Sequence, residues 1–208
     1  MDEGLNFQSV KRKFFLVANI ARTSEFSLND LPGAGRMDIV CRFIAQSLFI
    51  SHGVRRDSAA IVTLLGEPEP PKTVLIKGDE VKYMSPDERN IAGLLKKSLR
   101  LKVEKSWKKS SPGIYISSKD VEEVLDCFQS SKIVYLREDG QDLVKNISID
   151  DFLFVLGDHI GVPDELEQII ISKSDMVASL SPISLQADQC IIILHNILDR
   201  IERGWSCG

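Results

Sequence analysis

The fold is decided by the stretch Asp151-Phe-Leu-Phe-Val-Leu-Gly-Asp-His-Ile-Gly161, an apolar run that predicts a buried strand ending in a tight turn. A second short run follows, Met176-Val-Ala-Ser-Leu-Ser-Pro-Ile-Ser-Leu185, which reads as a strand and then a Ser-Pro loop. This loop leads into Cys190-Ile-Ile-Ile-Leu-His-Asn-Ile-Leu-Asp-Arg200, where the apolar residues have helical spacing. Buried strands that end in small-residue turns can hold a nucleoside mainly through backbone groups. The last third of the chain therefore predicts a ligand site.

The rest of the chain alternates between strand and helix patterns. Strands are expected in the apolar runs at 14–18, 59–65, 73–76 and 132–136. Helices are expected at 37–52, from the N-cap Ser85 to about Lys105, at 121–128 and at about 184–203. Such alternation predicts an α/β fold with a mostly parallel sheet flanked by helices. The polar stretch 22–35 is too long for a mere connector, which is typical of functional loops.

Composition narrows the class of protein and the number of domains. The 208 residues are 43% hydrophobic and 27% charged, and no apolar run approaches the roughly 20 residues that cross a bilayer. We expect a cytoplasmic protein with a flexible lead-in at 1–13 and a single domain at 14–208, of which about 130–208 holds the ligand. The stretch 108–113 reads as an exposed loop or as a boundary between halves. The four cysteines lack the paired spacing of a zinc site, so no metal is expected.

Three segments lie just past predicted strands, beginning at Leu136, Gly157 and Ser179. In a parallel sheet these ends share one edge, where ligands bind. The chain has neither a G-x-G-x-x-G nor a G-x-x-x-x-G-K-[ST] motif, so a nucleoside without phosphates fits better than a nucleotide. The alternative is that Gly157 and Gly161 simply close tight turns.

Several blocks together resemble a known family. They are Asp30-Leu-Pro-Gly33, Gly35-Arg-Met-Asp-Ile-Val-Cys-Arg42, Ser51-His-Gly-Val-Arg-Arg-Asp57, Ser85-Pro-Asp-Glu-Arg-Asn90, Gly157-Asp-His-Ile-Gly161, Ser179-Leu-Ser-Pro-Ile-Ser-Leu185, Cys190 and His195-Asn196. In this order they resemble the archaeal tRNA pseudouridine-54 N1-methyltransferases, which belong to the SPOUT superfamily. The resemblance runs from about Phe14 to Arg200.

The resemblance implies a fold, a cofactor and partners. It implies a C-terminal trefoil knot, an obligate homodimer, S-adenosylmethionine (SAM) as methyl donor and the T arm of tRNA as substrate. It places the cofactor against ten residues: Leu136, Gly157, Ser179, Leu180, Ser181, Pro182, Ile183, Ser184, Leu185 and Cys190. The alternatives are a methyltransferase of the same fold that acts on pseudouridine in rRNA, and a knotted RNA-binding module without catalysis.

Methylation of N1 of pseudouridine requires loss of the N1 proton. Asp38 is the candidate base, because a carboxylate in a partly dry cleft can have its pKa raised toward neutrality. A related family of rRNA pseudouridine N1-methyltransferases has a similar Arg-x-Asp block. Arg36 is the candidate that holds a uracil carbonyl or the developing negative charge. Alternatively, Asp38 only stabilises the helix that starts at this point.

Phosphate contacts are expected from arginines outside the cofactor segments. The candidates are Arg22, Arg55, Arg56 and Arg89. Lysines between Lys96 and Lys109 form a charge run that more often marks a solvated helix face. The net charge of -4 argues against general coating by nucleic acid but leaves room for a local basic patch.

Overall fold

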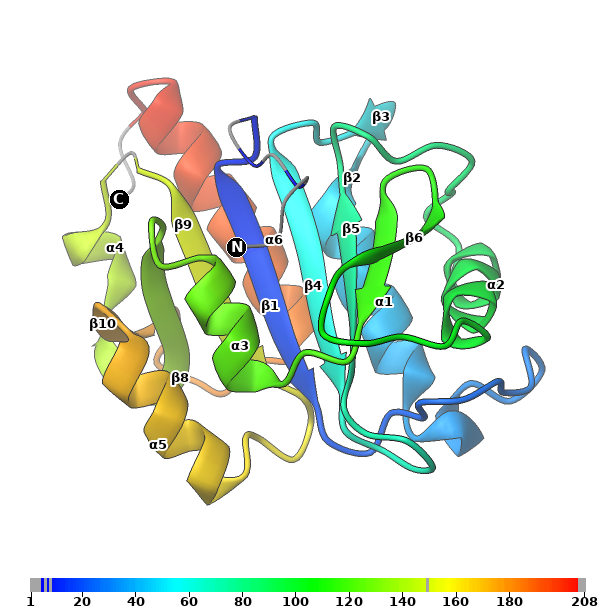
Figure 1. Cartoon of the computed structure of the whole chain (residues 1–208). Helices are drawn as coiled ribbons and strands as arrows, with labels where there is room; N and C mark the ends of the chain where they lie inside the picture. The colour runs from blue at the N-terminus through cyan, green and yellow to red at the C-terminus, as the bar shows by residue number, and fades with distance from the viewer. Residues whose placement is uncertain (1–4, 6, 8, 149, 206–208) are drawn as a thin grey trace.

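The structure is a computed structural model of the 208-residue chain and describes residues 5, 7, 9–148 and 150–205. Within these residues, eight strands form one sheet in the order β10-β8-β9-β1-β4-β5-β7-β6 (Figure 1). The strands are β1 (Arg12–Ala18), β4 (Ser58–Leu64), β5 (Lys72–Lys77), β6 (Lys108–Ser111), β7 (Ile114–Ser117), β8 (Lys132–Asp142), β9 (Phe152–Gly157) and β10 (Met176–Ser179). A separate hairpin joins β2 (Phe49–Ile50) to β3 (Gly53–Val54).

The sheet is parallel from β10 to β4 and antiparallel from β4 to β6. The predicted α/β fold with a mostly parallel sheet is therefore confirmed. All residues of β1 and β4 are buried, as expected for parallel strands with helices on both faces. The carboxyl ends of β8, β9 and β10 meet at the same edge, as the sequence predicts.

Helices cover the two faces of the sheet (Figure 1). α1, α2 and α6 pack on one face, and α3 and α5 pack on the other. The helices are α1 (Met37–Leu48), α2 (Glu88–Leu99), α3 (Val121–Cys127), α4 (Leu143–Asn146), α5 (Asp164–Lys173) and α6 (Ala187–Glu202), with a short 3-10 helix η1 (Pro32–Ala34). No helix of the described residues is both long and apolar enough to cross a membrane.

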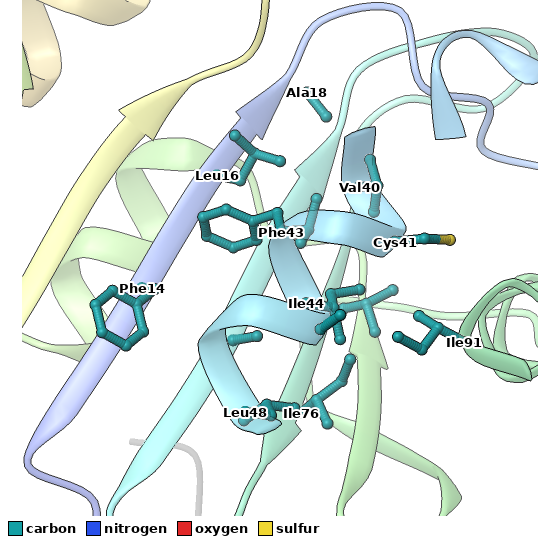
Figure 2. Packing of buried hydrophobic residues seen from close by; sticks show 14 of the residues in the cluster. Phe14, Leu16, Ala18, Val40, Cys41, Phe43, Ile44, Leu48, Ile76 and Ile91 are labelled. Atoms are coloured by element: carbon teal, nitrogen blue, oxygen red, sulfur yellow. The ribbon is translucent and has the colours of Figure 1, made fainter. Parts of the chain in front are cut away.

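The core follows from alternation along β1. Phe14, Leu16 and Ala18 face α1, where Phe43 and Ile44 pack against the sheet (Figure 2). The intervening residues of β1 belong to the cluster under α3 and α5. The Phe14 ring also stacks on Phe154 of β9, with ring centroids 5.7 Å apart. This packing ties the strand that carries the Gly157 turn to the centre of the molecule.

The helix predicted from Ser85 to about Lys105 is shorter at both ends. Its N-cap is Asp87, whose carboxylate accepts a hydrogen bond of 2.8 Å from the backbone N–H of Asn90. The Ser85 hydroxyl donates to Asp87 instead of capping the helix itself. The helix ends at Leu99, because the chain then turns toward β6.

The stretch 108–113 is neither an open loop nor a domain boundary. It forms β6 and the turn to β7, with Gly113 in the left-handed region at φ 72°. β6 is the last strand of the sheet, and its exposed lysines are typical of edge strands. Because β6 has no apolar run, a prediction based on apolar runs does not find this strand.

Other predicted boundaries shift by a few residues. The first long helix ends at Leu48 because the hairpin of β2 and β3 follows, and the last helix starts at Ala187 instead of Ser184. Arg12 and Lys13, expected in the flexible lead-in, are buried in β1. They are held by carboxylates, Arg12 by Asp199 among others and Lys13 by Asp151. The lead-in prediction for residues 1–4, 6 and 8 lies outside the described residues.

Candidate functional site

A cavity of about 1200 Å³ opens at the carboxyl ends of β8, β9 and β10. Its walls come from the turn after β9, the loop after β10, the first turn of α6 and the start of α1. Of the ten residues predicted for the cofactor, all except Pro182 line this cavity. Pro182 is exposed in the same loop. The three segments predicted to share one edge therefore come together around one space.

Gly157 is required by the close approach of its own turn. A Cβ atom added at Gly157 would lie 2.6 Å from the carbonyl carbon and 2.9 Å from the Cα of Gly161. These are backbone atoms, so any side chain at Gly157 must displace the turn. The turn closes through a hydrogen bond of 3.0 Å from the N–H of Gly161 to the carbonyl of Asp158.

Asn19, directly after β1, holds this turn in place through hydrogen bonds. Its backbone N–H and side-chain amide donate to the two carboxylate oxygens of Asp158 at 2.7 and 2.8 Å. The same amide donates to the carbonyl of Gly161 at 2.7 Å. The Asp158 side chain is only 5% exposed, so these bonds are shielded from water. Sequence reasoning missed Asn19, because only the pairing of β1 with β9 brings it to the turn.

Arg36 enters the cavity from the start of α1 in an unusual backbone conformation. It is the N-cap residue, with φ 61° and ψ 39° in the left-handed region, which non-glycine residues seldom adopt. Its guanidinium donates to both carboxylate oxygens of Asp38, at 3.1 and 3.0 Å. This two-point contact fixes the plane of the guanidinium at the cavity wall.

The expected rise in the pKa of Asp38 is wrong in direction. Burial of the side chain tends to raise the pKa, but hydrogen bonds from Arg36 and Arg42 outweigh it, and the pKa is lowered. Asp38 is also not among the residues that line the cavity. A carboxylate held ionised by two arginines is a weak base, so the geometry suits the positioning of Arg36 better than proton abstraction.

Arg42 links the start of α1 to the first turn of α6. Its guanidinium donates to Asp38 at 3.1 Å, and its Nε lies 3.4 Å from a carboxylate oxygen of Asp188. Asp188 stands next to Ala187 and Gln189, which line the cavity. The Arg36–Asp38 pair is thereby connected to the loop predicted to hold the cofactor.

Two further cavity residues, Tyr135 and Glu167, were not among the predicted site residues. The hydroxyl of Tyr135 donates to Glu167 of α5 at 2.7 Å. Tyr135 immediately precedes the predicted residue Leu136, so its place could have been inferred. Glu167 had no such signal, because α5 was not predicted.

Cys190 forms part of the wall in its reduced state. Burial, with a smaller contribution from the charge of Asp188, raises the pKa of the Cys190 thiol to about 11. The thiol is protonated at neutral pH and is therefore a poor nucleophile. The described residues also hold no group of three or more His, Cys, Asp or Glu side chains that could bind a metal ion.

The arginines predicted to bind RNA fall on two different edges. Arg22 and Arg89 lie at the sheet edge that carries the cavity. Arg22 follows β1, and Arg89 donates to Asn29, in the loop after β1, at 3.0 Å. Arg55 and Arg56 precede β4 and lie at the opposite edge of the sheet. The length of β4, from Ser58 to Leu64, separates the two edges by about 20 Å. Within one subunit, Arg55 and Arg56 are therefore far from the cavity, and their contact with RNA stays a prediction.

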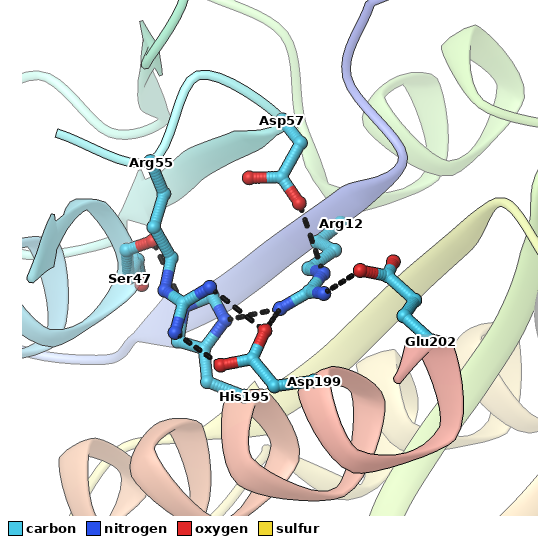
Figure 3. Close-up of polar contacts among 7 residues, drawn as sticks. All are labelled: Arg12, Ser47, Arg55, Asp57, His195, Asp199 and Glu202. Carbon is cyan, nitrogen blue, oxygen red and sulfur yellow. Dashed lines mark hydrogen bonds and ion pairs between the residues drawn. The ribbon is translucent and has the colours of Figure 1, made fainter. Parts of the chain in front are cut away.

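Arg55 is occupied within a buried network at that far edge (Figure 3). Its guanidinium donates to both carboxylate oxygens of Asp199, at 3.0 and 2.6 Å, and its side chain is 16% exposed. His195 lies between Arg12, at 3.3 Å, and the carbonyl of Ser47, at 3.1 Å. Because arginine only donates and a carbonyl only accepts, the ring is neutral with its proton on Nε2.

This network predicts a loss of stability in mild acid. Burial, followed by the charge of Arg55, lowers the pKa of His195 to about 3 from 6.5. The unfolded chain takes up a proton as the pH falls below about 6.5, whereas the folded chain does not until near pH 3. The free energy of unfolding should therefore fall by about 1–2 kcal/mol between pH 6.5 and pH 5.

Urea unfolding at these two pH values measures the effect. In His195→Gln the side-chain amide can still donate to Ser47 but does not titrate, so the difference should shrink by about half or more. His52→Gln, at an exposed position, should keep the full difference. Equal pH dependence in wild type and His195→Gln would contradict a neutral buried His195.

Comparison with known proteins indicates which family of enzymes the chain belongs to. The family model of SAM-dependent RNA methyltransferases matches residues 11–203. The chain belongs to this family. The tRNA (pseudouridine(54)-N(1))-methyltransferase of Methanosarcina acetivorans is 43% identical over 194 residues, which cover 92% of each chain. The enzyme of the same name from Methanococcoides burtonii is 43% identical over 200 residues, 94% of this chain and 99% of that protein.

A solved structure supports the fold of this methyltransferase. Nep1 of Archaeoglobus fulgidus, determined with bound S-adenosylhomocysteine, superposes with a TM-score of 0.64 over 93% of this chain and 100% of that chain. The sequences are 14% identical, so this likeness concerns the fold alone. It agrees with the α/β fold that the sequence predicts.

The cavity of this SAM-dependent methyltransferase fits its cofactor. Leu136, Leu180 and Ile183 give the cavity apolar walls, which suit an adenine ring. Gly157 lets the backbone of Gly161 pack directly against it, and this close approach shapes the turn that forms one wall of the cavity. When bound, SAM would supply an electrophilic methyl group. The residues that line the cavity would bind SAM and orient this methyl group.

Replacement of Asn19 is expected to weaken SAM binding. Asn19→Ala removes the two side-chain hydrogen bonds to the 158–161 turn and should raise the KM for SAM about tenfold, because each bond contributes about 1 kcal/mol and the turn keeps part of its order. The backbone N–H survives, so the fold should persist. Steady-state kinetics with varied SAM at saturating RNA measures the effect.

The matched control is Asn90→Ala, which removes an asparagine that accepts a hydrogen bond at the start of α2, away from the cavity. It should leave the KM for SAM unchanged. If Asn19→Ala also binds SAM like the wild type, the turn is held by other contacts and the positioning role of Asn19 is refuted.

Proposed function

We propose that this protein transfers the methyl group of SAM to N1 of pseudouridine 54 in the T arm of tRNA. The observation that carries the proposal is the cavity itself, which joins the predicted cofactor segments to the Arg36–Asp38 pair. The relatives that share 43% of their sequence over nearly the whole chain carry the same activity in their names.

The cofactor is held by the three segments at the cavity edge. We assign its binding to Leu136, Gly157, the loop from Ser179 to Leu185 and Cys190. Nine of the ten predicted residues line one space, which supports this assignment. These residues lie within the part of the single domain, about 130–208, predicted to hold the ligand.

The reaction forms a bond from N1 to the methyl carbon, breaks the bond from that carbon to sulfur, and releases the N1 proton. As this proton leaves, negative charge spreads from N1 to the uracil carbonyl oxygens. The Arg36 guanidinium, held at the cavity wall by Asp38, is placed to stabilise this charge. Asp38 therefore acts through Arg36, and the proton passes to solvent.

The proposal also includes a homodimer, a trefoil knot and a cytoplasmic location. We propose a homodimer, because Ile160, Ile183 and Ile192 are more than half exposed and lie at or near the cavity. We also propose a trefoil knot in the C-terminal part. It is supported by the sheet order β10-β8-β9 and by α6, which returns to the α1 face after β10. Action on tRNA supports a cytoplasmic location.

A methylation assay with T-arm minihelices tests the proposal. One minihelix carries pseudouridine at the target position, and the matched control carries uridine. Mass spectrometry of the products should show N1-methylpseudouridine only in the first. Methylation of an rRNA fragment containing pseudouridine, with none of either minihelix, would favour the rRNA alternative. Absence of methylation on every RNA would favour a binding module.

A further inference from the structure

Lys108 lies in the same row of the sheet as the cavity residue Leu156. The register connects them across neighbouring strands, in the order Lys108, Ile116, Val74, Val62, Leu16 and Leu156. Five strand spacings of about 4.8 Å separate them by about 24 Å. An exposed cation therefore stands on the edge that carries the cavity, although it is far from the cavity in sequence.

Two further cations lie between these points. Arg22 and Lys96 line a shallow depression of about 470 Å³ whose wall also includes Asp30 and Glu25, the latter paired with Arg100. Arg36 follows Ala34 closely and lines the main cavity. The loop after β1 and the helix α2 lie beside each other at the lower right of Figure 1. We call Arg22, Lys96, Lys102 and Lys108 the basic edge.

The lysines of the basic edge are not neutralised by carboxylates. Among the described residues, no ion pair involves Lys96, Lys102 or Lys108, and the Nζ of Lys108 donates only to the carbonyl of Lys102, at 3.3 Å. Neighbouring cations differ in this respect: Arg100 pairs with Glu25, and Lys105 pairs with Glu123. The basic edge thus keeps free positive charge in a protein whose net charge is -4.

Acidic side chains nearby do not cancel this charge. Glu69 is paired with Lys72 at 2.9 Å. Glu67 and Glu104 are exposed carboxylates of the same region. Asp30 is a third carboxylate of this region without an ion pair among the described residues. The four cations of the basic edge still outnumber these three carboxylates, so a local attraction for a polyanion remains.

Lysines on an edge strand also have a purely structural use, because they discourage pairing with strands of other molecules. That use accounts for Lys108 on β6. It does not account for Lys96 on α2, for Lys102 in the loop after α2, or for Arg22 in the loop after β1. All four lie along the sheet edge that carries the cavity, where one extended polyanion could contact them together.

We propose that the basic edge binds the phosphate backbone of the RNA stem whose nucleotide enters the cavity. This proposal rests on the proposed function, since it names where that substrate docks. It concerns the sheet edge that carries the cavity, whereas Arg55 and Arg56 lie on the opposite edge of the same subunit. A row of phosphates spans the 24 Å from the cavity to Lys108, whereas a free nucleoside does not.

The test compares two variants that each remove two positive charges. Lys102→Gln with Lys108→Gln alters the basic edge, and Lys11→Gln with Lys82→Gln alters exposed lysines at the amino edge. The probe is a fluorescent pseudouridine T-arm minihelix, whose binding is followed by anisotropy from low to high salt. SAM affinity and the kcat with saturating minihelix are measured for the same proteins.

We expect the basic-edge variant to bind the minihelix roughly tenfold more weakly and to lose about two from the slope of log affinity against log salt, one per phosphate contact. Its SAM affinity and kcat should equal those of the wild type, and the amino-edge variant should match the wild type throughout. Identical slopes for the two variants would overturn the basic edge.

The outcomes separate this inference from the proposed function. If the wild type methylates the minihelix and the two variants bind alike, only the docking surface is wrong. If the wild type binds the minihelix through the basic edge but methylates no RNA, the proposed function is wrong and the docking surface stands. If the wild type does not bind the minihelix at all, both are refuted.

Discussion

Replacement of Gly157 by valine is expected to weaken SAM binding roughly 100-fold and to abolish measurable methylation. The first added carbon atom would lie 2.6 Å from the carbonyl carbon of Gly161, a backbone atom that must move. Forcing a side chain into a packed site costs about 1–3 kcal/mol, and each 1.4 kcal/mol is a tenfold change in affinity. The displaced turn is also a wall of the cavity, so the strain falls on the ligand site.

Isothermal titration calorimetry with SAM measures this loss. Gly53→Val is the matched control, because a Cβ at Gly53 meets nothing within 4 Å. It should bind SAM like the wild type. Circular dichroism should show that Gly157→Val is folded, since the substitution alters only the carboxyl end of β9. Unchanged affinity in a folded Gly157→Val would refute the cavity as the SAM site.

Arg36→Ala is expected to lower kcat about 100- to 1000-fold with little change in SAM affinity. This range is what removal of one donor to a developing oxyanion costs in other enzymes. Arg36 lines the cavity and is held in the left-handed conformation. Arg42 also lines the cavity, but its guanidinium bridges Asp38 and Asp188. Single-turnover methylation of the pseudouridine minihelix measures the effect directly.

Arg36→Lys keeps the charge but loses the planar fork that meets both oxygens of Asp38. It should recover only part of the rate. Arg36→Ala with the kcat of the wild type would show that Arg36 does not touch the reacting base.

Asp38→Asn distinguishes positioning from base catalysis. If Asp38 only holds Arg36, its replacement should lower kcat about tenfold and leave the shape of the pH–rate profile unchanged. If Asp38 removes the N1 proton, the loss should be larger and the acidic limb of the profile should disappear. The lowered pKa of Asp38 favours the first result.

The sheet edge that carries the site could be predicted because its signal is local. Gly157 and Ser179 follow apolar runs, and parallel strands bring their carboxyl ends together whatever the details of packing. The chain direction alone was also enough to place Arg55 and Arg56, since residues that precede a parallel strand lie at its amino edge. Their contact with RNA stays a prediction.

Other features depend on contacts that no local pattern encodes. Asn19 reaches Asp158 only because β1 pairs with β9. The pKa of Asp38 depends on two arginines that outweigh its burial, and the approach of Arg42 depends on the folded helix. The edge strand β6 lacks an apolar run altogether, so its four polar residues gave no strand signal.

The central claim is that the cavity at the carboxyl ends of β8, β9 and β10 holds the methyl donor. A crystal structure with SAM or S-adenosylhomocysteine tests it most directly. The account predicts the adenosyl group between the Gly157 turn and the loop from Ser179 to Leu185, with the sulfur facing Arg36. The ligand bound at another place, with this cavity closed by side chains, would contradict it.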